Sequence, residues 1–258
     1  MLIHPNESID RLTSRLRIIQ KRRGHRAASD DTLLAWAAAR AHPEAKRVLD
    51  LGSGKGTVAM LLLQRLPRCR VIGLEGLAES NDLAARNATL NGLADRWEPR
   101  LGDLRDPTVL RGDSPFNLVT GAPPFMPVGS GVMPADPVRA AARFELRGGI
   151  REFAAAAAGA VAPDGKVVLL MDGLDRSETR AMQALADSGL FTCKIIVVRP
   201  SPGRNPIYRI FEAGRQSGSR TEISLCMRID EAGEFSPEYE AVRHEMDCST
   251  VEVPQSRG

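Results

Sequence analysis

Residues Val48–Gly56 read VLDLGSGKG. A short apolar strand that carries Asp50 runs into a glycine loop, and a helix-forming segment follows directly. The loop holds three glycines at alternate positions: Gly52, Gly54 and Gly56. Glycines permit positive φ and let a ligand approach the backbone where a Cβ would otherwise stand. The spacing GxGxG is not the GxGxxG dinucleotide fingerprint, and Lys55 is followed by glycine instead of the Ser or Thr of a phosphate loop, so we expect a ligand loop of another kind.

Strands and helices alternate on both sides of this loop. The pattern predicts strands at residues 47–51, 70–74, 97–101, 116–120, 166–171 and 192–198. It predicts helices at residues 31–41, 57–66, 78–91, 146–161 and 178–188. Two last strands, at 207–212 and 221–229, flank a polar, glycine-containing turn and are expected to pair antiparallel. The alternation predicts an α/β fold with a doubly wound, Rossmann-like, mostly parallel seven-stranded sheet and a C-terminal antiparallel hairpin.

The composition is that of an ordinary globular protein. Of 258 residues, 43% are apolar and 26% are charged, and the net charge of +3 permits a nucleic-acid partner without requiring one. Four cysteines lie far apart and predict no metal site: Cys69, Cys193, Cys226 and Cys248. The first residues lack a charged-then-apolar leader, and no apolar run is long enough to span a bilayer. We expect a cytoplasmic protein without membrane or metal partners, as a monomer or homodimer.

Two carboxylates follow the glycine loop at the ends of the next two strands. Glu75 ends the strand at 70–74, and an acidic residue about 20 positions after such a loop suits a pair of ribose hydroxyls. Asp103 follows the strand at 97–101, where a carboxylate can accept a hydrogen bond from an adenine amino group. Open α/β sheets bind ligands at the carboxyl ends of their strands, so the sequence predicts an adenosine-type ligand there.

This set resembles the class I S-adenosylmethionine (SAM) methyltransferases. The resemblance implies that SAM is the cofactor, with Asp50 and the glycine loop facing its methionine part. It implies that Glu75 contacts the ribose, and that Asp103 and the neighbouring Leu104 contact the adenine.

The turn after the strand at 116–120 carries the expected catalytic residues: Ala122, Pro123, Pro124 and Phe125. In SAM enzymes that methylate a planar nitrogen, this strand ends in Asn-Pro-Pro followed by Tyr or Phe. The resemblance implies that the prolines fix the turn beside the sulfonium and that the aromatic ring stacks on the flat target. The Asn oxygen and the first proline carbonyl accept hydrogen bonds from the target amino group and align its lone pair. Ala122 stands where the motif has Asn and cannot accept a hydrogen bond.

Further segments resemble the bacterial tRNA adenine-N6 methyltransferases that act next to the anticodon of valine tRNA. Residues 18–35 match their Q-x3-G-x-R-x3-D-x2-L-L segment at Gln20, Gly24, Arg26, Asp30, Leu33 and Leu34. The resemblance implies that Gln20, Arg26 and Asp30 belong to the cofactor site. The stretch around Phe144 resembles the family's Ala-Arg-His-Glu helix, with Phe in place of His. Its neighbours Arg143 and Glu145 either position the N-terminal segment or the nucleic acid, or form a surface ion pair.

Ala122 leaves three interpretations open. The enzyme methylates adenine with the Pro123 carbonyl and another acceptor, or it acts on a different planar acceptor, such as a protein or small molecule. In the third interpretation it binds SAM without catalysis, which we rank lowest because the rest of the expected SAM site is intact. The loop at 126–137 is expected to frame the substrate site.

Basic residues gather in residues 9–26, which are either a solvated helix face or an arm that faces RNA. With the turn at 215–220, this segment makes tRNA a candidate partner through phosphate contacts. The sequence thus divides into a basic N-terminal segment with a helix at 1–46, a methyltransferase domain at 47–230 and a polar tail at 231–258. The tail is expected to be partly disordered.

Overall fold

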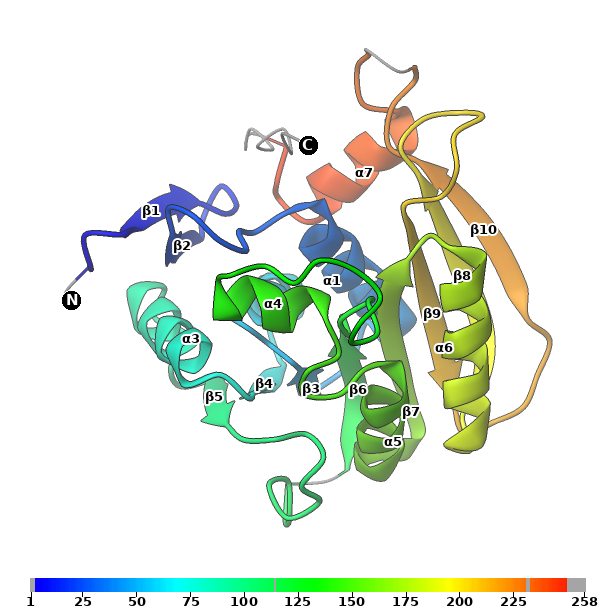
Figure 1. Cartoon of the computed structure of the whole chain (residues 1–258), viewed down its shortest axis with the longest axis horizontal. Helices are drawn as coiled ribbons and strands as arrows, with labels where there is room; N and C mark the ends of the chain where they lie inside the picture. Colours follow the sequence, from blue (N-terminus) through cyan, green and yellow to red (C-terminus); the bar gives the residue numbers. More distant parts are fainter. Residues whose placement is uncertain (1–2, 114, 231–232, 250–258) are drawn as a thin grey trace.

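The computed structural model describes residues 3–113, 115–230 and 233–249 (Figure 1). Its centre is a sheet with the strand order β10-β8-β9-β7-β6-β3-β4-β5. In chain order these strands are β3 (Arg47–Leu51), β4 (Arg70–Glu75), β5 (Trp97–Leu101), β6 (Phe116–Gly121), β7 (Val161–Asp172), β8 (Phe191–Arg199), β9 (Tyr208–Gly214) and β10 (Thr221–Cys226). All neighbours pair parallel except β9, which runs antiparallel to β7 and β8. The predicted α/β fold with a mostly parallel sheet is confirmed.

Two details of the predicted sheet are wrong. Among the described residues the central sheet has eight strands instead of seven. The C-terminal hairpin does not form, because β10 pairs parallel with β8 instead of folding back on β9. The physical reason is that β9 lies between β7 and β8, so both of its hydrogen-bonding edges are already occupied.

Helices cover both faces of the sheet (Figure 1). They are α1 (Ser29–Ala41), α2 (Thr57–Arg65), α3 (Ala78–Leu90), α4 (Pro137–Arg143), α5 (Ile150–Ala160), α6 (Asp175–Asp187) and α7 (Pro237–Glu245). One apolar cluster takes side chains from α1, α2, α3 and α7, and the other takes them from α5 and α6. The helix predicted at 146–161 begins only at Ile150, because Gly148 adopts φ +110° and interrupts the chain between α4 and α5.

The basic N-terminal segment is not a helix face. It forms an antiparallel hairpin of β1 (Glu7–Arg11) and β2 (Arg17–Lys21), in which Ile18 and Ile19 are buried. The hairpin is fastened to α3, where Arg86 donates two hydrogen bonds of 2.7 Å to the carboxylate of Glu7. Asn87 accepts from Ile19 N at 2.6 Å and donates to Lys55 O at 3.0 Å. This one side chain therefore joins the hairpin to the glycine loop.

The C-terminal tail is ordered where the structure describes it. Helix α7 buries Tyr239 and Val242 against the cluster that contains α1. Glu245, at the end of α7, accepts hydrogen bonds from Trp36 Nε1 at 3.0 Å and from Arg65 Nη2 at 2.9 Å. Part of the tail thus forms a helix, and the partial disorder expected for the tail stays a prediction, because residues 231–232 and 250–258 lie outside the described residues.

Candidate functional site

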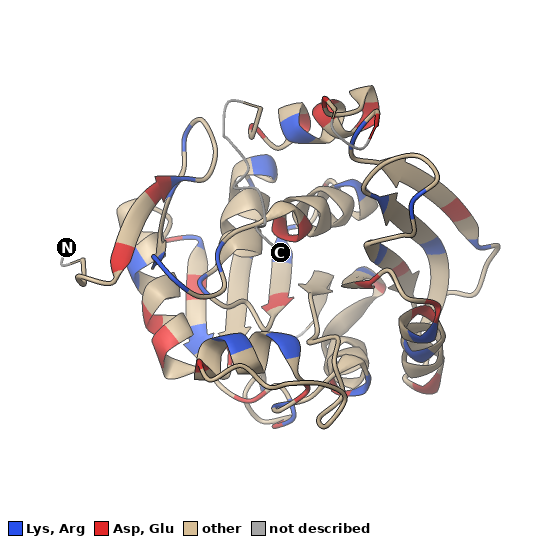
Figure 2. Cartoon of the chain, turned by 45° about the horizontal axis from the view of Figure 1, so that its top comes forward, with Lys and Arg blue, Asp and Glu red and all other residues tan. Residues whose placement is uncertain are grey.

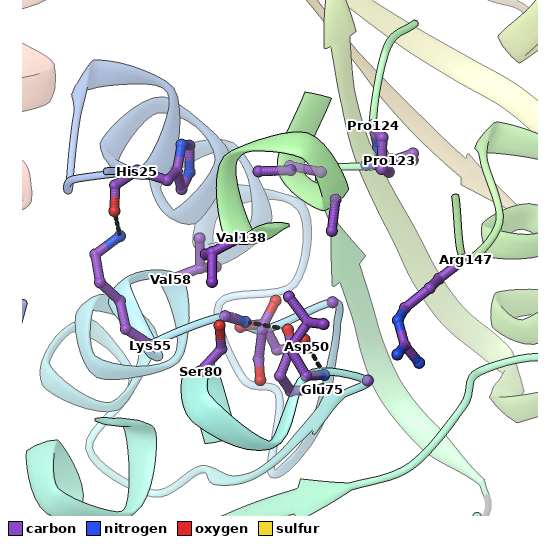
Figure 3. Close-up of a pocket in the computed structure, with 18 of the residues that line it drawn as sticks. His25, Asp50, Lys55, Val58, Glu75, Ser80, Pro123, Pro124, Val138 and Arg147 are labelled. Carbon is purple, nitrogen blue, oxygen red and sulfur yellow. Dashed lines mark hydrogen bonds between the residues drawn. The ribbon is translucent and has the colours of Figure 1, made fainter. Parts of the chain in front are cut away.

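A cavity of about 530 Å³ opens at the carboxyl ends of β3, β4 and β6 (Figure 3). Parallel strands bring these ends to one edge of the sheet, which is why residues far apart in sequence meet there. The predicted residues that line the cavity are Asp30, Asp50, Gly52, Gly54, Glu75, Asp103, Leu104 and Ala122–Phe125. Three others lie outside its lining: Gln20, Arg26 and Gly56.

The glycines of the loop have two different roles, ligand contact and packing. Gly52, Gly54 and Gly56 all have positive φ, at +64°, +57° and +88°. A Cβ built on Gly54 would meet no heavy atom within 4 Å, so this position faces open space in the cavity wall. A Cβ built on Gly56 would lie 1.9 Å from Cη2 of Trp97, so this glycine is needed for packing between α2 and β5. Gly54 is thus the position at which a ligand can lie against the backbone.

Glu75 is fixed by the backbone. Its Oε2 accepts a hydrogen bond from Gly54 N at 2.8 Å, and its Oε1 accepts one from Leu77 N at 2.6 Å. Burial raises the pKa of this carboxyl despite these bonds. Each oxygen keeps a further lone pair, so the carboxylate can still accept hydrogen bonds from hydroxyl groups of a ligand.

Asp50 is buried with one carboxylate oxygen left without a partner. The residue is 2% exposed, and its Oδ2 has no hydrogen-bond partner among the described residues. Burial raises its pKa well above the ordinary value, and the nearby carboxyls of Asp31 and Glu75 raise it further. Thr120 sits beside Asp50 in the register of β3 and β6, and its hydroxyl likewise lacks a partner within the described part of the chain. A positively charged ligand group would satisfy this carboxylate.

Lys55 is a site residue that the sequence reasoning missed. Its side chain is 8% exposed, lines the cavity and donates from Nζ to the backbone oxygen of His25 at 3.3 Å (Figure 3). Burial lowers the pKa of this ammonium, and the negative charges of Asp31 and Asp30 act against that shift. Its place inside the glycine loop was the available signal. The sequence pattern compares Lys55 only with the lysine of a phosphate loop, and that comparison excludes a phosphate loop without indicating another ligand for Lys55.

Gln20 and Arg26 stabilise the segment between β2 and α1, which covers the cavity beside Lys55. Gln20 donates to Asp10 Oδ2 at 3.0 Å and accepts from Ala27 N at 2.9 Å. Arg26 donates to Asp10 Oδ2 at 2.9 Å and to Lys21 O at 2.8 Å. These bonds close the loop between β2 and α1, so both residues hold His25 and Asp30 beside the cavity instead of lining it themselves.

Asp103 lies at the mouth of the cavity and is already paired. Arg105 donates to its Oδ1 from Nε at 2.9 Å and to its Oδ2 from Nη2 at 2.6 Å. These bonds lower the pKa of Asp103 to about 2. The carboxylate is therefore ionised over the physiological range, and a ligand amino group would share it with Arg105.

The turn at 122–125 is held in place by the segment at 143–145. Phe125 is half-buried and packs against both apolar clusters. The next residue, Met126, donates to Arg143 O at 2.9 Å and accepts from Glu145 N at 3.0 Å. Glu145 forms an ion pair with Arg180 of α6 and none with Arg143, which is exposed and lines the cavity. Glu145 thus positions the turn through the backbone of its own segment.

Comparison with known proteins places this site in a family. The methyltransferase small domain model matches residues 31–149. A tRNA1(Val) (adenine(37)-N6)-methyltransferase from Aeromonas hydrophila is 32% identical over 204 residues, which cover 78% of this chain and 82% of the relative. The chain belongs to the tRNA1(Val) (adenine(37)-N6)-methyltransferase family. It is accordingly an enzyme, a SAM-dependent methyltransferase, as the sequence predicts.

More distant matches share the central fold. A release factor glutamine methyltransferase from Mycolicibacterium smegmatis is 32% identical over 168 residues, 63% of this chain and 58% of the relative. The crystal structure of a predicted O-methyltransferase from Agrobacterium tumefaciens superposes with a TM-score of 0.64 at 23% identity, covering 84% of this chain and 96% of the other. At that identity the superposition shows the fold alone.

The residues present fit SAM, which carries two positive groups and one carboxylate. The unpartnered Oδ2 of Asp50 suits a positive group, the buried Lys55 suits a carboxylate, and the open space at Gly54 admits the chain between them. In the described ranges, no helix is long and apolar enough to cross a membrane. The same residues contain no group of three or more His, Cys, Asp or Glu side chains that could hold a metal ion.

Proposed function

We propose that this enzyme transfers a methyl group from SAM to N6 of an adenine in tRNA. One observation carries the proposal. The Pro123-Pro124-Phe125 turn forms a wall of the same cavity whose other walls hold Asp50 and Glu75. The family membership supports the choice of tRNA adenine, because a relative that matches 78% of the chain carries that substrate in its name.

The chain's own residues divide the cofactor between them in this proposal. Asp50 accepts from the ammonium group, Lys55 donates to the carboxylate, and Glu75 accepts from the ribose hydroxyls. Asp103 and Leu104, at the mouth, contact the adenine ring. When bound, SAM supplies an electrophilic methyl group on a positively charged sulfur. The surplus of acidic groups around the cavity favours such a cation over a neutral ligand.

The turn orients the acceptor. The two prolines limit the backbone, so the Pro123 carbonyl is held at one place and can accept a hydrogen bond from the amino group. The ring of Phe125 is held by its packing and offers a face on which the base can stack. An adenine must leave its own stack to reach this turn, so we infer that the base is extruded from the RNA.

Two basic segments flank the cavity and suit RNA phosphates. Arg22 and Arg23 are exposed in the segment between β2 and α1, whose neighbours Lys21 and His25 line the cavity. Helix α4, on the other side, carries exposed Arg139. Figure 2 shows basic residues on both segments. The turn at 215–220 is less suited, because β9 is antiparallel and its end lies at the opposite edge of the sheet. A tRNA substrate implies a cytoplasmic enzyme.

The runner-up is methylation of a protein glutamine or a small molecule. The shorter match to a release factor glutamine methyltransferase favours a protein acceptor, whereas Ala122, which departs from the Asn-Pro-Pro motif, favours neither glutamine nor adenine. The match to the tRNA relative covers more of both chains, 78% of this chain and 82% of the relative, which is why we place tRNA first.

The test uses SAM labelled in its methyl group and total tRNA from a strain that lacks anticodon-loop adenine methylation. We expect wild type to release S-adenosylhomocysteine (SAH) and to place the label in N6-methyladenosine after nuclease digestion. Asp50→Ala should abolish labelling, while Asp164→Ala, which alters an exposed residue of β7, should not. Raising the salt concentration should weaken tRNA binding. Wild type that binds SAM but leaves tRNA unlabelled would refute the tRNA proposal and direct the search to proteins.

A further inference from the structure

The cavity contains a carboxylate beside the altered motif. Asp172 is the last residue of β7 and lines the cavity together with Ala122–Phe125. The motif at 122–125 does not indicate this carboxylate, because Asp172 lies 50 residues after Ala122 in the sequence. It is adjacent because β7 is the neighbour of β6 in the sheet. Their pairing ends at Gly121 and Leu169, and β7 continues three residues further along the cavity wall.

Strand alternation places Asp172 on the cofactor side of the sheet. Val168 pairs with Thr120, and Thr120 pairs with Asp50. Because successive side chains point to opposite faces, Asp172 shares the face of Val168, and thus that of Thr120 and Asp50. Val168 packs in the same apolar cluster as α1, which covers that face. The carboxylate therefore ends the row of β7 side chains on the side where the cofactor would lie.

This carboxylate is free to accept from a ligand. Its Oδ1 accepts one long hydrogen bond, from Leu174 N at 3.3 Å, and no other donor contacts it within the described ranges. Arg209 of the neighbouring strand is committed elsewhere, with ion pairs of 2.8 Å to Asp175 and to Glu178. Asp172 is half-buried, and a bound base would cover the part of its side chain that is exposed.

The backbone after Asp172 is fixed. Gly173 donates from N to Ile207 O at 2.9 Å. A Cβ on Gly173 would lie 2.0 Å from Pro206 O, so the two chain segments touch backbone to backbone. Such close packing fixes the backbone from which the Asp172 side chain extends, and a catalytic hydrogen-bond acceptor needs a backbone restrained in this way.

We propose that Asp172 is a catalytic residue that accepts the second hydrogen bond from the target amino group, in place of the Asn that Ala122 replaces. The inference rests on the proposed function. The nitrogen lone pair forms the new N–C bond, and the C–S bond breaks with its electron pair on sulfur. The surplus proton on nitrogen passes to the Asp172 carboxylate and from there to water. Pro123 O accepts from the other N–H.

The test compares wild type, Asp172→Ala, Asp172→Asn, Ala122→Asn and the double variant Ala122→Asn/Asp172→Ala on tRNA. Asp172→Ala should lower kcat by roughly 10²–10³, the usual effect of removing one hydrogen-bonding group at a reacting centre. The kcat of Asp172→Asn should lie between those of wild type and Asp172→Ala. The amide oxygen of Asn can still accept the hydrogen bond, but the amide cannot take up the proton. The double variant should have a kcat at least about tenfold higher than that of Asp172→Ala. Such a non-additive effect is expected if Asn at position 122 and Asp172 share the role of acceptor.

Two controls separate this role from a structural one. SAH affinity, measured by calorimetry, should be the same in wild type and Asp172→Ala, and Asp164→Ala should keep full activity. The proposal is overturned if Asp172→Ala keeps the wild-type kcat, if Ala122→Asn rescues nothing, or if SAH affinity falls in parallel with kcat. Wild type that methylates no tRNA adenine overturns the proposed function, and this inference with it. An active wild type with an equally active Asp172→Ala overturns the inference alone.

Discussion

At the scale of single residues, Asp50 shows a conflict between folding and binding. Its carboxyl is buried, has an orphan oxygen and has a pKa raised by burial and by Asp31 and Glu75. A buried carboxyl of this kind binds its proton more tightly in the folded chain than in the unfolded one. The stability of the cofactor-free protein must therefore fall as the pH rises from about 3.8 through the raised pKa.

Asp50→Asn should stabilise the cofactor-free protein and weaken cofactor binding. The amide keeps the shape without the cost of ionisation, so we expect a gain of roughly 1–2 kcal/mol at neutral pH. The gain should vanish below about pH 3.8, where both states of the wild type are protonated. SAH affinity should fall by more than about tenfold, because hydrogen bonds to charged groups contribute about 1.5–3 kcal/mol. Thermal unfolding at the two pH values and calorimetry measure both effects, and a less stable variant at neutral pH would contradict this account.

Lys55→Met should affect only ligands that carry the amino-acid part of the cofactor. We expect SAH affinity to fall by about tenfold or more, because a buried charge-assisted bond is lost. The affinity for 5′-methylthioadenosine, which lacks the carboxylate, should stay the same. Lys21→Met is the matched control, since Lys21 also lines the cavity but is paired with Glu79 at 2.7 Å. Equal losses for the two ligands would show that Lys55 acts on the loop instead of the carboxylate.

The sequence identified the residues whose roles lie in a local pattern. Asp50 and Glu75 stand at strand ends next to glycines, so their place in the cavity could be predicted. Asp172 and Lys55 could not be found in this way. Asp172 reaches the cavity through the order of strands, and Lys55 becomes a buried cation only because the segment of His25 folds over it.

At the scale of elements, the glycine loop offers a matched set of substitutions. Gly54, Gly56 and Gly92 share positive φ, and alanine at such a position costs roughly 1–2 kcal/mol. Gly54→Ala and Gly92→Ala should destabilise by this amount alone, since neither new Cβ meets an atom within 4 Å. Gly56→Ala should cost roughly 1–3 kcal/mol more, because its Cβ overlaps the ring of Trp97.

The same set separates packing from binding. Only Gly54 lines the cavity, so Gly54→Ala should lower SAH affinity while Gly92→Ala leaves it unchanged. Urea unfolding and calorimetry on the three variants provide the comparison. Equal unfolding free energies for Gly54→Ala and Gly56→Ala would show that Trp97 gives way, and the packing role of Gly56 would then be wrong.

Local periodicity explains which elements could be predicted. The alternating strands and helices of residues 47–120 follow it closely, because each apolar strand is followed by its own turn and helix. The hairpin of β1 and β2 was missed, since its arginines dominate the composition while Ile18 and Ile19 provide the burial. The pairing of β10 depends on which strand edge is still open, and no local pattern encodes that.

At the scale of the whole molecule, the turn between β1 and β2 contacts the residues that follow α7. Ser14, after β1, donates from N to Asp247 O at 3.1 Å, and Gln64 of α2 donates to Asp247 Oδ2 at 3.2 Å. Helix α7 fills the space beside α1. We therefore propose that the catalytic domain extends past residue 230 and includes α7.

Tyr239→Ala should destabilise the protein by about 3–5 kcal/mol, as expected for truncating a fully buried aromatic side chain. Tyr239 is 1% exposed and lies in the cluster that contains α1. Glu238→Ala, in the same turn of α7 but exposed, should change the unfolding free energy by less than about 0.5 kcal/mol. Urea unfolding followed by circular dichroism measures both. A Tyr239 variant as stable as the control would mean that α7 is a separate appendage.

The division of the cavity between pairs of strands has a consequence for descent. The proposed cofactor contacts of Asp50 and Glu75 come from β3 and β4, whereas Ala122 directly follows β6 and Asp172 ends β7. A lineage can therefore exchange the acceptor side of the cavity while its hold on the methyl donor stays intact. Each ancestor in such a lineage would keep a working site for the methyl donor. A new acceptor could therefore be adopted stepwise, while every intermediate enzyme still transferred methyl groups.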